Sequence, residues 1–141
     1  MSAADNKRIM QEIFGAGDRA DRRRLFLARL ADEVTMEVTG SHSWSQVFRG
    51  KERVLADLYG YLHTLLREPG RTDAFRFIAD GDWVVVEAKG DMVRADGTPY
   101  RNDYCLLYRL KDGRILEMKE YQDSLLCERV LGPYPQDRKR P

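Results

Sequence analysis

Glu120 is the residue of this chain whose surroundings suggest chemistry most clearly, because alternation along the sequence points its carboxyl into an apolar cup beside Tyr104 and Asn102. Burial raises the pKa of a carboxyl toward neutrality, and a hydroxyl donor such as Tyr104 lowers it. A carboxyl tuned in this way can accept or donate a proton near neutral pH, while Asn102 orients a carbonyl or a water. We therefore predict an acid/base site with Glu120, Tyr104 and Asn102 as catalytic residues. The alternative is a structural buried glutamate.

Other chemistries have weaker support in the sequence. His42 and His63 have no partners at metal-ligand spacing, so we expect no metal, and nothing in the chain indicates a cofactor. Cys105 is expected to point outward without a paired base, which argues against a thiol nucleophile. With Cys127 it gives neither a disulfide framework nor a metal pair. The roles of His42, Tyr121 and Asp123 stay open.

Helices are predicted first and strands last. Apolar spacing predicts helices over residues 6–14, 18–31 and 50–68, with a short strand at 33–39 and a serine-rich loop at 40–49. Three Asp-Gly turns then join four β-rich runs, which predicts an antiparallel meander. The runs cover residues 72–79, 82–94, 100–110 and 114–123. Helices on one side of a curved antiparallel sheet make an α+β domain.

The inward face of the sheet follows from period-2 alternation, which places Tyr104, Leu106 and Ala88 inside. Ala88 and Gly90 are small residues on a bulky apolar face, so they indicate unfilled volume. The alternative for Gly90 is that it marks a bulge. We predict that the wall of the pocket consists of Met36, Val38, Trp44, Ala88, Leu106 and Met118.

The direction of Glu120 depends on the last hairpin. A two-residue loop would pair Leu110 with Ile115 and push Glu117 and Lys119 into the core, at a cost of several kcal/mol. A three-residue loop with Gly113 in a left-handed bulge pairs Leu110 with Arg114 and places apolar against apolar. We predict the second register. Its further pairs are Leu116 with Tyr108, Met118 with Leu106, Glu120 with Tyr104, and Gln122 with Asn102.

Length and composition limit the class of protein. The 141 residues include 43% hydrophobic residues, enough for one core, so we expect a single domain over 1–131 and a flexible tail over 132–141. A net charge of +1 argues against a nucleic-acid partner. There is no apolar run of about 20 residues, so we expect no membrane partner. The polar start, without a signal-peptide core, predicts a cytoplasmic protein.

Taken together, the motifs over about residues 5–131 resemble the SnoaL-like group of the nuclear-transport-factor-2 and ketosteroid-isomerase superfamily. The resemblance implies a cone-shaped α+β barrel with N-terminal helices packed on the curved sheet. The matching pieces are Gly17-Asp18, residues 31–35, residues 48–52, residues 102–104, residues 112–115 and residues 120–123.

The activity implied by the resemblance is limited by departures from it. Two positions that are catalytic in the steroid isomerases are occupied by Val38 and Met10 here, which cannot transfer protons. Of the catalytic residues of the epoxide-hydrolase-like members, only the carboxylate on the last strand, Glu120, is present. Polyketide cyclases of the group resemble this chain in carrying an acid/base carboxylate at that position, although as Asp. The resemblance thus implies isomerase, cyclase or lyase chemistry on a small apolar ligand without a cofactor.

Two further functions remain open from the sequence. The cup could bind a hydrophobic ligand without turnover, or the chain could serve as an interaction domain. Val85, Leu107 and Ile115 are expected on the outer sheet face among charged residues, and such a mixed surface suits a homodimer.

Overall fold

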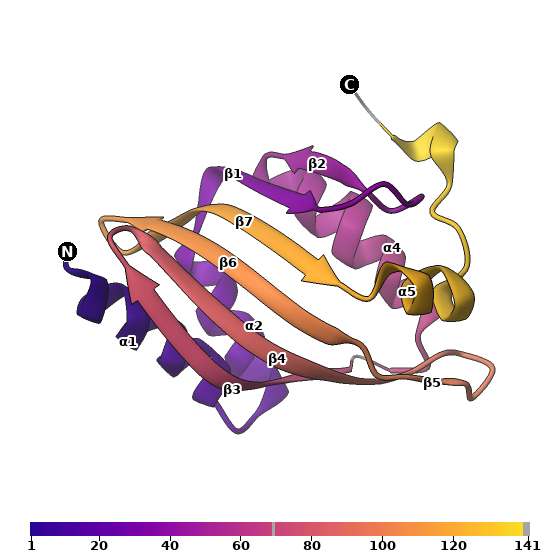
Figure 1. The fold of residues 1–141 in the computed structure, drawn as a ribbon, viewed down its shortest axis with the longest axis horizontal. Helices are drawn as coiled ribbons and strands as arrows, with labels where there is room; N and C mark the ends of the chain where they lie inside the picture. Colours follow the sequence, from indigo (N-terminus) through magenta and orange to yellow (C-terminus); the bar gives the residue numbers. More distant parts are fainter. Residues whose placement is uncertain (69, 140–141) are drawn as a thin grey trace.

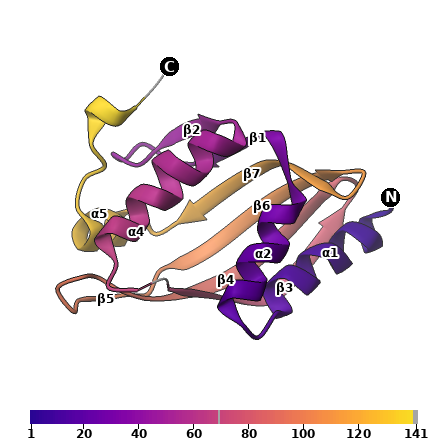
Figure 2. The same cartoon turned by 180° about the vertical axis from the view of Figure 1, so that it is seen from behind.

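A computed structural model describes residues 1–68 and 70–139 as helices covering one face of a sheet (Figure 1). The elements in chain order are α1 (Ala3–Gly15), α2 (Arg19–Arg29), β1 (Leu30–Val38), β2 (Gln46–Arg49), α3 (Lys51–Arg53), η1 (Val54–Gly60), α4 (Tyr61–Leu65), β3 (Arg71–Asp80), β4 (Trp83–Val93), β5 (Pro99–Tyr100), β6 (Asp103–Lys111), β7 (Arg114–Gln122), α5 (Ser124–Leu131) and η2 (Gln136–Arg138). Figure 2 shows α1, α2 and α4 lying across the sheet.

The sheet has the order β2-β1-β7-β6-β4-β3, with β5 paired to β4. Its pairs are antiparallel except for β1 and β7, which run parallel. This architecture confirms the predicted α+β class and the packing of the N-terminal helices on a curved sheet. β7, which carries Glu120, lies between β1 and β6, so both of its edges are hydrogen-bonded.

The helices begin where the sequence offers caps. Ser2 and Asp5 form a capping box at the start of α1, and the Asp18 carboxylate accepts the Ala20 backbone N–H at the start of α2. Residues 51–65 form one helical stretch whose middle, η1, has π-helical turns. A wider turn shifts the side chains that follow out of the ordinary 3.6-residue phase. This shift bears on which residues of the stretch face the sheet.

Three segments differ from the sequence-based expectation. Residues 46–49, expected as loop, form β2 against β1, and α5 was not anticipated. In the expected flexible tail, Tyr134 is only 1% exposed, packs against Trp44 and Tyr61, and donates its hydroxyl to the Asp57 backbone oxygen at 2.9 Å. Residues 140–141 of that tail lie outside the described residues.

The predicted register of the last hairpin was wrong. Asp112 and Gly113 have φ values of 51° and 78°, which is the conformation of a two-residue type I′ turn, and Leu110 pairs with Ile115. Leu116 is then an extra residue in β7, because the next pair joins Arg109 to Glu117. This bulge inverts the alternation, so that Ile115 and Met118 both face inward.

In the observed register Glu120 has a different cross-strand partner from the predicted one, but it stays on the inward face of the sheet. Glu120 lies opposite Leu106 rather than Tyr104, and Met118 lies opposite Tyr108 rather than Leu106. Ile115, expected on the outer face, is 0% exposed in the core. The prediction compared only unbroken ladders, in which a two-residue turn would have buried Glu117 and Lys119. A bulge allows the short turn and still keeps these two charged residues on the outer side.

Candidate active site

A cavity of about 730 Å³ lies between the sheet and the helices. Of the predicted wall, Met36, Val38, Trp44, Leu106 and Met118 line it, and Ala88 does not. Of the predicted catalytic residues, Glu120 and Tyr104 line it and Asn102 does not. The remaining apolar lining comes mainly from helices, including Ile13, Phe14, Phe26, Leu58, Leu62 and Leu131.

Glu120 is fixed by its backbone and surrounded by apolar side chains. Its strand neighbours are Val38 on β1 and Leu106 on β6. Its backbone oxygen accepts the Thr39 N–H at 3.1 Å and the Thr39 hydroxyl at 2.8 Å. Among the residues that the structure describes, no side chain donates a hydrogen bond to the carboxylate, and burial raises its pKa from 4.5 to about 7. The carboxyl therefore exchanges a proton near neutral pH.

Three tyrosines of the cavity lie within electrostatic range of Glu120: Tyr59 on η1, and Tyr104 and Tyr108 on β6. Burial raises the pKa of each phenol, and the Glu120 charge raises it further. All three hydroxyls are therefore protonated at neutral pH. A protonated phenol beside a carboxylate can donate a hydrogen bond to negative charge that develops on a bound molecule.

Asn102 contacts the end of β7 instead of the cavity. Its side-chain oxygen accepts the Asp123 N–H at 3.0 Å, and its amide nitrogen donates to the Asp123 backbone oxygen at 3.0 Å and to the Tyr100 hydroxyl at 2.8 Å. The side chain is 1% exposed. These contacts fix the backbone three residues beyond Glu120.

The small residues of β4 serve to accommodate Tyr104. Ala88 pairs with Tyr104 across the strands, and a Cβ on Gly90 would lie 2.9 Å from Tyr104 Cε2. The ladder stays regular at Gly90, because the shift in β3–β4 pairing falls between Ala74 and Arg76. The Tyr104 ring therefore fills the volume that Ala88 and Gly90 leave, and the cavity lies on its other side.

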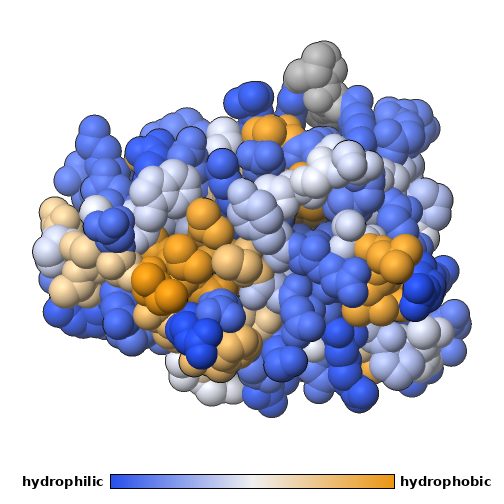
Figure 3. Space-filling view, viewed as in Figure 1, coloured by the Kyte–Doolittle hydropathy of each residue, from blue (hydrophilic) through white to orange (hydrophobic). Residues whose placement is uncertain are grey.

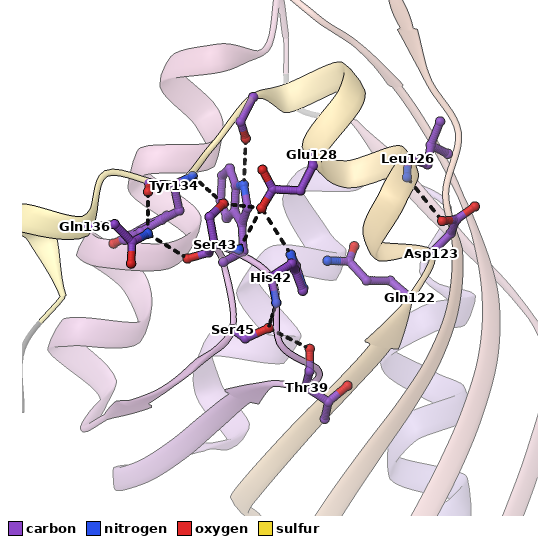
Figure 4. A network of polar contacts seen from close by, with 12 residues as sticks. Thr39, His42, Ser43, Ser45, Gln122, Asp123, Leu126, Glu128, Tyr134 and Gln136 are labelled. Atoms are coloured by element: carbon purple, nitrogen blue, oxygen red, sulfur yellow. Dashed lines mark hydrogen bonds and ion pairs between the residues drawn. The ribbon is translucent and has the colours of Figure 1, made fainter.

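The loop that carries Trp44 is tied to α5 and to the C-terminal segment (Figure 4). Trp44 Nε1 donates to the Gly132 backbone oxygen at 2.9 Å. The Ser43 N–H and hydroxyl both donate to Glu128 Oε1, the N–H at 2.7 Å. Burial acts to raise the pKa of Glu128, but these hydrogen bonds outweigh it and lower the pKa. His42 Nδ1 lies 3.6 Å from the same oxygen. This network holds Trp44 as one wall of the cavity.

Sequence reasoning missed part of the polar lining. Alternation placed Tyr108 on the inward face with Tyr104, but it was not predicted as a site residue. Tyr59 lies on a π-helical turn that an ordinary helical period does not anticipate. Cys127 lies on α5 and also lines the cavity. Burial raises the pKa of its thiol to about 11, so it is protonated. Over residues 1–68 and 70–139, no three His, Cys, Asp or Glu side chains gather as metal ligands.

Similar proteins were found in sequence and in structure. The SnoaL-like domain matches residues 8–118, while no curated protein matches the sequence. Bal32a, from a soil-derived mobile gene cassette, has a TM-score of 0.78 at 14% identity, covering 92% of this chain and 98% of its own. A proposed SnoaL-like polyketide cyclase from Jannaschia has a TM-score of 0.73 at 20% sequence identity, and the alignment covers 94% of this chain and 95% of the cyclase. TerC, co-crystallised with polyporic acid, has a TM-score of 0.74 at 19% sequence identity, and the alignment covers 89% of this chain and 97% of TerC.

These structures share the fold of this chain. The domain match spans most of the sequence and ends at residue 118, two residues before Glu120. No helix in the described part of the chain is long and apolar enough to cross a membrane. The chain belongs to the SnoaL-like domain family.

Proposed function

We propose that the chain is a cofactor-independent acid/base enzyme that isomerises, cyclises or cleaves a small, largely apolar substrate, with Glu120 as the proton-transferring residue. The observation that carries the proposal is a carboxyl with a pKa of about 7 in an apolar cavity of about 730 Å³. The volume falls within the usual range for small-molecule sites. The proposed SnoaL-like polyketide cyclase from Jannaschia and the polyporic acid co-crystallised with TerC support a small-molecule function.

The chemistry suited to this site starts from a carbon acid. Ionised Glu120 removes a proton next to a carbonyl, and the electron pair of the broken C–H bond forms an enolate. A hydroxyl from Tyr104, Tyr59 or Tyr108 donates a hydrogen bond to the enolate oxygen. Where the substrate has a double bond β,γ to the carbonyl, the enolate is conjugated with it, and Glu120 returns the proton to the γ carbon, which completes an isomerisation. In a cyclisation the enolate carbon instead attacks a second carbonyl, and the proton goes to the resulting alkoxide.

The test uses exchange of a carbon-bound proton for deuterium. Ketones such as 2-tetralone are incubated with the protein in D₂O, and NMR follows the label at the carbon next to the carbonyl. We expect catalysed exchange that falls about 100-fold in Glu120→Gln, because general-base catalysis contributes at least that much. Glu117→Gln, on the outer side of the same strand, is the matched control and should exchange like the wild type.

A binding module without turnover is the second candidate function, and the same experiment separates the two. If the ketone binds with the same affinity to the wild type and to Glu120→Gln and neither protein exchanges the proton, the cavity binds a ligand without catalysis. The two free thiols at Cys105 and Cys127 fit the reducing cytoplasm, which we propose as the location.

A further inference from the structure

The entrance of the cavity has a different character from its interior. The lining residues that are exposed to solvent lie together near the start of α2 and the end of α4. They are Asp18, Arg19, Ala20, Arg23, His63 and Glu68. Arg22, between Arg19 and Arg23 on α2, is half-buried and also lines the cavity. A ligand therefore enters past one turn of helix that carries three arginines.

The charge of these arginines is not neutralised in the described part of the chain. Arg19 and Arg23 make no hydrogen bond or ion pair there. Arg22 donates to two backbone carbonyls, at Thr72 (2.7 Å) and Ala16 (3.4 Å), and its buried Nε has no partner. Arg71, which lines a second hollow together with Arg19 and Arg22, already pairs with Asp73 at 2.9 Å. Within the described residues, the α2 arginines thus present positive charge that no carboxylate offsets at ion-pair distance.

The charge and the space at the entrance both suit an anionic group of a ligand. Burial lowers the pKa of His63, and the charge of Arg23 lowers it further, so Arg23 acts on this end of the cavity. Asp18 and Glu68 also line the entrance, where the three arginines outnumber these two carboxylates. The second hollow, of about 350 Å³, shares Asp18, Arg19 and Arg22 with the cavity and is also lined by Arg71. There is therefore room beside the arginines for an anionic group.

We propose that the ligand of this cavity is an amphipathic organic anion, with an aromatic or alicyclic body and one carboxylate. The carboxylate would lie at Arg19, Arg22 and Arg23, because arginine binds planar oxyanions by paired, charge-assisted hydrogen bonds. The body would extend into the apolar interior, where Glu120 repels a second anion. The inference rests on the proposed function only in taking the cavity as the ligand site.

The test compares two fluorescent probes that differ by one anionic group. 8-Anilinonaphthalene-1-sulfonate carries a sulfonate on the ring skeleton of the neutral N-phenyl-1-naphthylamine. We expect Arg19→Gln/Arg23→Gln to weaken sulfonate-probe binding about tenfold and to change neutral-probe binding by less than about twofold. Raising NaCl from about 50 to about 500 mM should weaken binding of the sulfonate probe alone. Arg24→Gln, on the same helix but paired with Asp21 and outside the cavity, is the matched control.

Arg22 is tested with a conservative pair, because its contacts with backbone carbonyls also join α2 to the start of β3. Arg22→Gln should lose affinity for the sulfonate probe, and Arg22→Lys, which keeps the charge, should recover most of it. Equal losses for both probes, or no loss in any arginine variant, would overturn the proposal. Loss of the sulfonate-probe signal in Ile78→Ser would also overturn the proposal, because it would show that the probe binds to the outer sheet face instead of the cavity.

The outcome is independent of catalysis. Glu120→Gln should keep the preference for the sulfonate probe even though it loses proton exchange. If exchange is absent in the wild type while the arginine variants discriminate between the probes, the enzyme proposal fails and the anion site stands. If the wild type catalyses exchange while the arginine variants do not discriminate between the probes, the anion-site proposal fails and the enzyme proposal stands.

Discussion

Glu120 makes the folded protein hold a proton that the unfolded chain has already lost. Its pKa rises from 4.5 to about 7 on folding, so between these values the folded state binds more protons. The free energy of unfolding therefore falls as the pH rises through this interval and levels off above it. Because Glu120 keeps some solvent contact, we expect a loss of about 1 to 3 kcal/mol.

Replacing Glu120 by glutamine tests this dependence, because the amide has the same shape and does not titrate. Relative to wild type, Glu120→Gln should be equally stable near about pH 4 and more stable by about 1 to 3 kcal/mol near about pH 8 in urea unfolding experiments. Other carboxylates titrate in both proteins and cancel in the difference. A stability difference that stays constant with pH would show that Glu120 ionises like an exposed residue. Glu117→Gln should not reproduce the pH-dependent gain.

Gly90 and Tyr104 give a second test at the residue scale. A methyl group on Gly90 would approach Tyr104 Cε2 to 2.9 Å, so Gly90→Ala must displace the ring toward the cavity. We expect a loss of about 1 to 3 kcal/mol in unfolding free energy and weaker binding of the neutral naphthylamine probe. Gly15→Ala is the control, since a Cβ there meets nothing within 4 Å. Unchanged stability in Gly90→Ala would contradict the close packing of the ring.

At the scale of elements, the bulge at Leu116 decides which way β7 presents its side chains. Deleting Leu116 leaves Ile115 followed directly by Glu117, so a regular ladder would keep Ile115, Met118 and Glu120 inward. We expect the deletion variant to fold with a loss of about 1 to 2 kcal/mol and to keep the pH-dependent stability that Glu120 confers. Deleting Lys119 instead would turn either Met118 or Glu120 outward and should abolish that dependence or prevent folding. Equal behaviour of both deletions would contradict the bulge.

The bulge also shows what the sequence could and could not predict. Period-2 alternation and the cost of burying Glu117 and Lys119 together predicted the correct face for Glu120. They did not predict its cross-strand partner, because a bulge adds a residue that cannot be recognised in the alternation of apolar and polar residues. Likewise, the small residues Ala88 and Gly90 indicated space, but only coordinates show that the Tyr104 ring occupies it. Local patterns report which face a residue takes, whereas cross-strand neighbours depend on the whole sheet.

At the scale of the whole molecule, the outer sheet face is the surface that the fold leaves without a covering layer (Figure 3). Ile78, Val85 and Leu107 are cross-strand neighbours there, and we call them the outer stripe. Ile78 is 53% exposed. Ion pairs border the stripe on both sides, Arg76 with Glu87 at 2.7 Å and Arg109 with Glu117 at 2.9 Å. An apolar centre with a rim carrying both charge signs can pair with a second copy of itself.

We therefore predict a homodimer that forms through the outer stripe, measured by sedimentation velocity across a range of concentrations. Val85→Glu, at the centre of the stripe, should shift the protein to monomer, because a buried unpaired carboxylate costs several kcal/mol. Leu125→Glu is the control, since Leu125 is 67% exposed on α5, away from the stripe. Dissociation by Leu125→Glu alone would move the interface to α5, and a wild type that stays monomeric at high concentration would refute the dimer. Because the cavity opens near α2, on the side of the sheet opposite the stripe, monomeric Val85→Glu should still bind the sulfonate probe like the wild type.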